Sequence, residues 1–70
     1  MKIVTLPFKP NKEPGGEEHR GVMISRWLKE QGLTIGKDYT WRVDQVKKEL
    51  QFIFNGEAEA WATVITMREI

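Results

Sequence analysis

The residues best suited to chemistry lie together at positions 17 to 20, where two carboxylates, a histidine and an arginine follow one another. A histidine held by a carboxylate can act as a general base. No nucleophile accompanies it, because the chain has no cysteine and its only serine, Ser25, lies in the middle of a predicted helix. The single histidine, His19, also excludes the pair of histidines that binds zinc on a metallohydrolase helix. We therefore expect no catalytic residue, no metal site and no enzymatic activity.

The segment Pro14-Gly15-Gly16 lies between a predicted strand and a predicted helix, as phosphate-binding loops do. It contains neither the P-loop pattern nor the G-x-G-x-x-G pattern. Glu17 and Glu18 follow directly, and two carboxylates at a helix start would repel a phosphate group. We interpret the segment as a loop before an acidic helix start, and we expect no cofactor.

Basic residues adjoin aromatic ones near the middle of the chain, which is a feature of proteins that stack nucleic-acid bases. Arg42 follows Trp41, and Lys47 and Lys48 come shortly after. The net charge is only +1, from 11 Lys and Arg against 10 Asp and Glu, so no strong attraction to nucleic acid is expected. A nucleic-acid-binding domain that uses Arg42, Lys47 and Lys48 as phosphate contacts is therefore the alternative hypothesis.

A protein-binding role is the leading hypothesis, and Trp27 is its main residue. Trp27 lies at the margin of an apolar helical stripe beside Met23, and an incompletely buried tryptophan is a typical interface anchor. Lys9 and Lys12, in the loop before this helix, complete the predicted partner-binding surface. A free sheet edge is a second candidate surface, and it could also pair two copies, so both a monomer and a homodimer stay open.

The first half of the chain must position these residues with a strand and a helix. Lys2 to Phe8 is short, β-branched and apolar, which predicts a strand, and Pro7 should end it or lie at a sheet edge. Residues 9 to 16 are rich in proline, glycine and lysine, which predicts a mobile loop. Residues 17 to 31 have helical spacing. Gly32 should end this helix with Leu33 folded back onto it.

The second half begins with a predicted hairpin. Tyr39 to Asp44 alternates with its aromatic residues on one face, and Glu49 to Phe54 alternates again, with a polar turn between them. The segment at 57 to 68 is ambiguous, because Asn55-Gly56 suggests another hairpin. A strand there would place Glu57 and Glu59 on the apolar face, which is costly, so a helix is favoured.

The predicted order is therefore β-α-β-β-α in one α+β domain over residues 1–70. We expect a two-layer sandwich in which two helices cover one face of a three-stranded mixed sheet, with the first two strands joined by a parallel crossover. The strand order stays open. No apolar run approaches the ~18 residues of a membrane span, and the first residues do not form a secretory signal. We expect no membrane association and a cytoplasmic location.

The C-terminal half resembles small accessory proteins encoded by tailed bacteriophages. The resemblance lies in Trp41-Arg42-Val43-Asp44, in Leu50-Gln51-Phe52-Ile53-Phe54 and in the acidic, alanine-containing segment from Glu57 to Trp61. These motifs are structural, so no functional residue is carried over. The resemblance implies a phage protein that acts in the bacterial host cytoplasm by binding and modulating a host protein.

Overall fold

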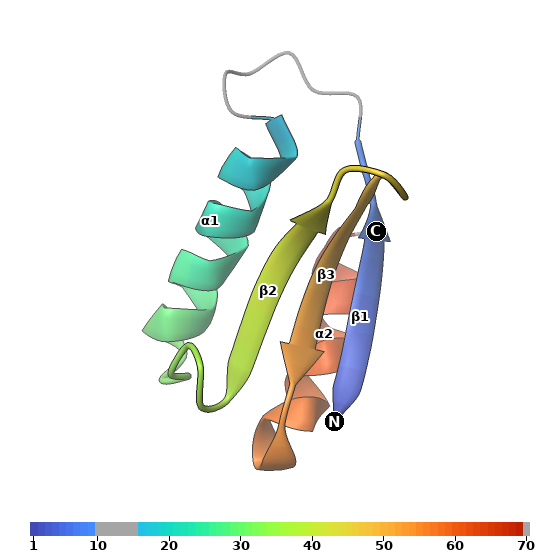
Figure 1. Cartoon of the computed structure of the whole chain (residues 1–70). Coiled ribbons are helices and arrows are strands. Elements are labelled where there is room, and N and C mark those ends of the chain that lie inside the picture. Colours follow the sequence, from blue (N-terminus) through green and yellow to red (C-terminus); the bar gives the residue numbers. More distant parts are fainter. Residues whose placement is uncertain (10–15, 70) are drawn as a thin grey trace.

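The computed structural model describes residues 1–9 and 16–69, and it forms two layers, a sheet and a pair of helices (Figure 1). The loop predicted at 9–16 falls mostly on residues 10–15, outside the described ranges. The elements follow the predicted β-α-β-β-α order, with one short 3₁₀ turn added before the last helix: β1 Lys2–Pro7, α1 Gly16–Glu30, β2 Tyr39–Asp44, β3 Glu49–Phe54, η1 Gly56–Ala60 and α2 Trp61–Glu69.

The three strands lie in the order β1-β3-β2, and both neighbouring pairs are antiparallel. The expectation of a mixed sheet was therefore wrong. β1 and β2 run in the same direction, as the predicted crossover requires, but β3 lies between them and removes the parallel pairing (Figure 1). Pro7, which has no N–H to donate, suits β1 to an edge of the sheet.

One face of the sheet carries the core. Tyr39, Phe52 and Phe54 have no exposed surface, and Trp41 packs against Phe52 with ring centroids 5.9 Å apart. The predicted inward orientation of these aromatic rings is confirmed. The buried apolar residues of the two layers are Val4, Leu6, Ile24, Leu28, Tyr39, Leu50, Phe52, Phe54, Ala58, Ala62 and Ile65.

The end of α1 was predicted from a glycine and a leucine, and it is confirmed in detail. Gly32 has φ +95°, a conformation that glycine adopts without steric cost. The Leu33 N–H donates to the Leu28 carbonyl at 3.2 Å, and the Gly32 N–H donates to the Lys29 carbonyl at 3.0 Å. These two bonds define a Schellman motif, and they fix where the chain leaves α1 for β2.

The ambiguous segment after β3 is helical, as the register argument favoured. A 3₁₀ turn begins at Gly56 and leads into α2, which buries Ala62 and Ile65 against β1 and β3. Asn55 precedes the turn in an extended conformation, but its side chain makes no capping hydrogen bond. The burial of its apolar residues, and not a side-chain cap, therefore positions α2. None of the helices in the described residues is long and apolar enough to cross a membrane.

Candidate functional site

A groove of about 290 Å³ lies between α1 and the end of α2, and we call it the interhelical groove. It brings together Met23 and Trp27, the two residues that the sequence proposed as a partner-binding pair. Met23 is 46% exposed, whereas Trp27 is half-buried against the core. The residues that line the groove are Arg20, Met23, Ile24, Arg26, Trp27, Glu30, Arg68 and Glu69.

Trp27 is held in place by neighbours from α2. Its ring meets the ring of Trp61 edge-on at 5.6 Å, with the planes at 76°. The Arg68 guanidinium lies 4.2 Å from the Trp27 ring centroid, within the range of a cation–π contact. A ring fixed in this way loses little freedom when a partner packs against it, which is the property expected of an interface anchor.

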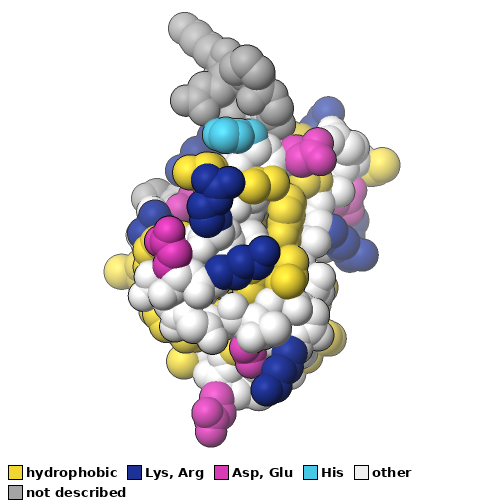
Figure 2. All heavy atoms as spheres, turned by 90° about the vertical axis from the view of Figure 1, so that its left-hand side faces the viewer, with side chains coloured by type: hydrophobic (Ala, Val, Ile, Leu, Met, Phe, Trp, Pro, Cys, Tyr) yellow, Lys and Arg dark blue, Asp and Glu magenta, His cyan; other side chains and the backbone are white. Residues whose placement is uncertain are grey.

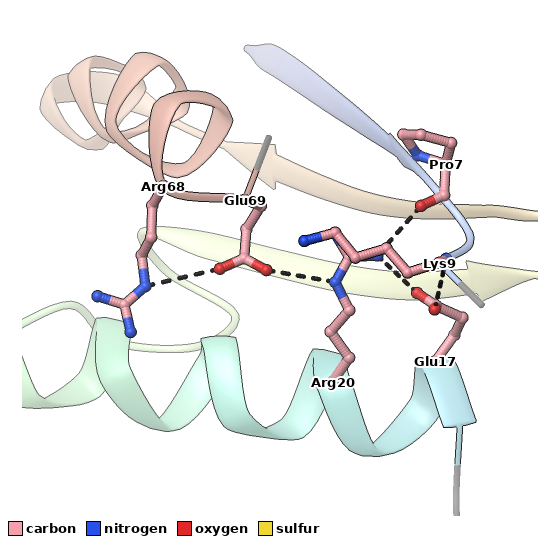
Figure 3. A network of polar contacts seen from close by, with 6 residues as sticks. All are labelled: Pro7, Lys9, Glu17, Arg20, Arg68 and Glu69. Atoms are coloured by element: carbon pink, nitrogen blue, oxygen red, sulfur yellow. Dashed lines mark hydrogen bonds and ion pairs between the residues drawn. The ribbon is translucent and has the colours of Figure 1, made fainter. Parts of the chain in front are cut away.

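A chain of charged contacts joins three elements beside the interhelical groove, and two of its members, Arg20 and Glu69, line the groove (Figure 3). Arg20 on α1 donates to the Pro7 carbonyl at 3.1 Å, to Glu17 at 2.7 Å and to Glu69 on α2 at 3.2 Å. The Lys9 backbone N–H donates to Glu17 at 2.9 Å. The network connects the end of β1 to both helices, so it sets the spacing of the groove walls.

The Arg20 guanidinium is unusually enclosed for an arginine. Its side chain is 12% exposed, and the side chains of Glu17 and Glu69 are 6% and 15% exposed. One nitrogen, Nη2, is buried and has no hydrogen-bond partner in the described part of the chain. Charges this buried are tolerated only when paired, so Arg20 serves the structure of the groove.

A second groove, of about 410 Å³, lies on the other side of α1, where the helix meets β2, and we call it the edge groove. Val22 and Ile35 line it and are 41% and 45% exposed. Figure 2 shows a strip of hydrophobic side chains running down this face, with Lys and Arg side chains alongside. The lining residues are Val22, Ser25, Arg26, Lys29, Ile35 and Trp41.

The three cations of the nucleic-acid alternative lie apart from both grooves. Arg42 is on the open face of the sheet, where its Nε donates to Gln51 at 2.7 Å. Gln51 in turn donates to Glu49 at 3.2 Å, so a carboxylate shares this surface. Lys47 and Lys48 are in the exposed β2–β3 turn, and Lys48 lies over the Phe8 ring. No aromatic ring of β2 or β3 faces outward beside these cations to stack a base.

The residues that suggested acid–base chemistry are used differently. Glu17 is buried in its pairing with Arg20, Glu18 is exposed, and His19 is exposed at the start of α1. Across residues 1–9 and 16–69, no three His, Cys, Asp or Glu side chains gather in a way that could hold a metal ion.

The structure brings two of the predicted partner-binding residues together. Met23 and Trp27 share the interhelical groove. Lys9 is not among its lining residues, although its backbone N–H donates to Glu17 in the adjoining network, and Lys12 lies outside the described residues. Arg68 and the edge groove were missed. The exposed Val22, an apolar residue outside the core stripe of α1, was the available signal for the edge groove.

Three comparisons with known proteins complete the description. The phage resemblance of the C-terminal half stays a prediction. No family model matches the chain, and no similar curated protein or solved structure was found, so its function must be inferred from its own residues.

Proposed function

We propose that this chain is a small, non-enzymatic protein-binding domain that contacts its partner through α1 and the interhelical groove. The observation that carries the proposal is the exposed Met23 beside a Trp27 ring already fixed by Trp61 and Arg68. Methionine, tryptophan and arginine are all enriched in interface cores.

The chemistry of the groove supports a protein partner. An exposed methionine can adapt its flexible side chain to the shape of an apolar residue that a partner inserts. Arg26 and Glu30 also line the groove, and such charged groups can fix the register of a protein partner. The phage resemblance adds the expectation that the partner is a host protein of the bacterial cytoplasm whose activity the domain modulates.

The experiment is affinity capture from bacterial lysate with the tagged chain, run in parallel with two variants. Met23→Lys places a charge in the interhelical groove, and we expect it to abolish retention of the captured protein. Met67→Lys is the matched control, because Met67 is 76% exposed on α2 outside this groove. Trp27→Ala is less informative, since it would also remove packing against Trp61.

Two results would contradict the proposal. One is that the wild-type chain and Met23→Lys retain the same proteins. The other is that the purified chain binds single- or double-stranded oligonucleotides at about 50 mM salt, with an affinity that falls steeply as salt is added. That second result would support the nucleic-acid alternative.

A further inference from the structure

The alternation of hydrogen-bonded and non-bonded pairs in the sheet determines which backbone groups of β2 point away from β3, to the free edge. The Asn55 N–H donates to the Asp38 carbonyl at 2.9 Å, so this pair bonds across β2 and β3. Successive pairs of an antiparallel ladder alternate between bonded and non-bonded. The backbone N–H and C=O of Tyr39 therefore point away from β3, and the Tyr39 carbonyl accepts a hydrogen bond from the Gly36 N–H at 2.6 Å. By the same alternation, the N–H and C=O groups of Trp41 and Val43 point to the free edge.

These outward groups of β2 are a template for another strand. In the part of the chain that the structure describes, no hydrogen bond reaches the backbone of Trp41 or Val43 along this edge. An unpaired row of this kind is the surface to which extended peptides add in strand-addition complexes.

The opposite edge of the sheet, β1, is better protected. The Phe8 N–H donates to the Lys48 carbonyl at 3.1 Å, so this pair is a bonded one. By the same alternation, the backbone groups of β1 that point away from β3 belong to Ile3, Thr5 and Pro7. Pro7 has no N–H to offer. Lys2 lies opposite Phe54, so it is a charged residue on the inward face of the strand. Proline and inward-facing charge are both devices that discourage strand addition, and β2 carries neither.

The edge groove lies beside the free edge of β2 and gives it chemical selectivity. Its apolar wall is formed by Val22, Ile35 and Trp41, which could accept the apolar side chains of an added strand. Arg26 and Lys29 line the same groove, and neither forms an ion pair with another described residue. Two cations with no ion-pair partner among residues 1–9 and 16–69 complement an extended segment that also carries carboxylates.

We propose that the free edge of β2 is the docking site for an extended acidic peptide segment of the partner protein, which adds to the sheet as a fourth strand. Every second side chain of the added strand faces α1, where the apolar wall and the two cations lie together, so the segment presents both its apolar and its acidic residues on that one face. This inference rests on the proposed protein-binding function and names the partner's chemistry.

A second copy of the chain fits this edge less well. Two copies joined edge to edge at β2 would bring their two α1 helices together, with Arg26 and Lys29 of both copies along one seam. Like charges placed together disfavour such an interface. An acidic strand from a different protein instead supplies negative charge opposite Arg26 and Lys29.

The test begins with selection from a displayed library of random linear peptides against the folded chain. We expect the recovered peptides to carry apolar and acidic residues at every second position, which is the face turned to the edge groove, and to lose binding when their amides are N-methylated at alternate positions. Val43→Pro removes an outward N–H without removing a β2–β3 hydrogen bond, and we expect it to weaken these peptides by about tenfold or more. Thr5→Pro is the matched control on the outward side of β1 and should leave the affinity unchanged.

A second variant keeps the test decisive if Val43→Pro does not fold. Arg26→Glu with Lys29→Glu reverses the charge of the groove, and selection against it should recover basic peptides. Recovery of no peptide, or of peptides that bind the wild type, Val43→Pro and the charge-reversed variant equally, would overturn the proposal. A wild-type dimer that Val43→Pro or the charge-reversed variant dissociates would also overturn it, in favour of self-association.

The two proposals fail separately. If the protein captured from lysate is lost with Met23→Lys but retained by Val43→Pro and by the charge-reversed variant, the protein-binding function stands and the β2 docking site is wrong.

Discussion

Two contacts at the level of single residues hold α1 against β2. Ser25 is buried in α1, and its hydroxyl donates to the Tyr39 hydroxyl at 2.6 Å. The Tyr39 hydroxyl donates in turn to the Ser25 carbonyl at 3.0 Å. The only serine of the chain therefore satisfies the one polar group that Tyr39 carries into the core. Beside it, Gly21 allows α1 to approach the Trp41 ring.

Replacement of Gly21 by alanine should destabilise the protein, although the same change usually stabilises a helix. An added Cβ would lie 2.7 Å from Cε3 and 2.8 Å from Cη2 of Trp41, and closer still to Cζ3. Overpacking of this kind costs about 1–3 kcal/mol, more than the roughly 0.5–1 kcal/mol that alanine gains in a helix. Chemical denaturation of Gly21→Ala should show the loss.

The matched variant is Gly21→Ala combined with Trp41→Leu, which makes room for the new methyl group. The cost of Gly21→Ala should be smaller in the Trp41→Leu background than in the wild type. Equal costs in the two backgrounds would show that the Trp41 ring does not set the helix approach.

The sequence predicted the place of these residues better than their partners. Helical spacing placed Gly21 in the stripe that faces the sheet, and it placed Met23 and Trp27 side by side. It could not reveal that Trp41, from a distant strand, lies against Gly21, or that Arg20 joins Glu17 to Glu69. Such pairings depend on how elements pack, and no local pattern encodes them.

At the level of elements, boundaries set by local chemistry were predictable. Gly32 and Leu33 define the end of α1 through hydrogen bonds within a few residues, and the register argument identified the last segment as a helix. The sheet was only partly predicted. β3 lies between β1 and β2 because it pairs with a strand along each of its edges, and alternation within a strand cannot reveal which strands pair.

The β2–β3 turn is stabilised by an ionised carboxylate. Asp44 Oδ1 accepts from the Lys47 N–H at 2.9 Å and from the Val46 N–H at 3.0 Å. The bond from Lys47 is the largest cause that lowers the pKa of Asp44 below its usual 3.8. Because the unfolded chain binds a proton more readily, this contribution to stability is present above pH 3.8 and is lost as the pH falls through the lowered pKa.

Asp44→Asn keeps an acceptor oxygen but removes this titration. The free energy of unfolding should therefore depend less on pH in the variant than in the wild type below pH 3.8. Denaturation of both proteins across acidic pH isolates Asp44, since the other carboxylates are common to both. Parallel pH profiles would contradict the role given to this turn.

At the level of the whole molecule, the aromatic residues of the sheet are used for the core and the surfaces around α1 are left for contacts. Tyr39, Phe52 and Phe54 are fully enclosed, whereas the interhelical groove and the edge groove flank α1 on either side. Arg26 lines both grooves. A partner that covers α1 could therefore engage Met23 on one side and the free edge of β2 on the other.

Residue-resolved amide hydrogen exchange, measured with and without the captured partner protein, tests this account most directly. The amides of Trp41 and Val43 face the free edge, so they should exchange rapidly in the isolated chain and become protected in the complex. The amides of Ile3 and Thr5, on the edge of β1, should be unchanged. Protection that appears on β1 and leaves Trp41 and Val43 unchanged would contradict it.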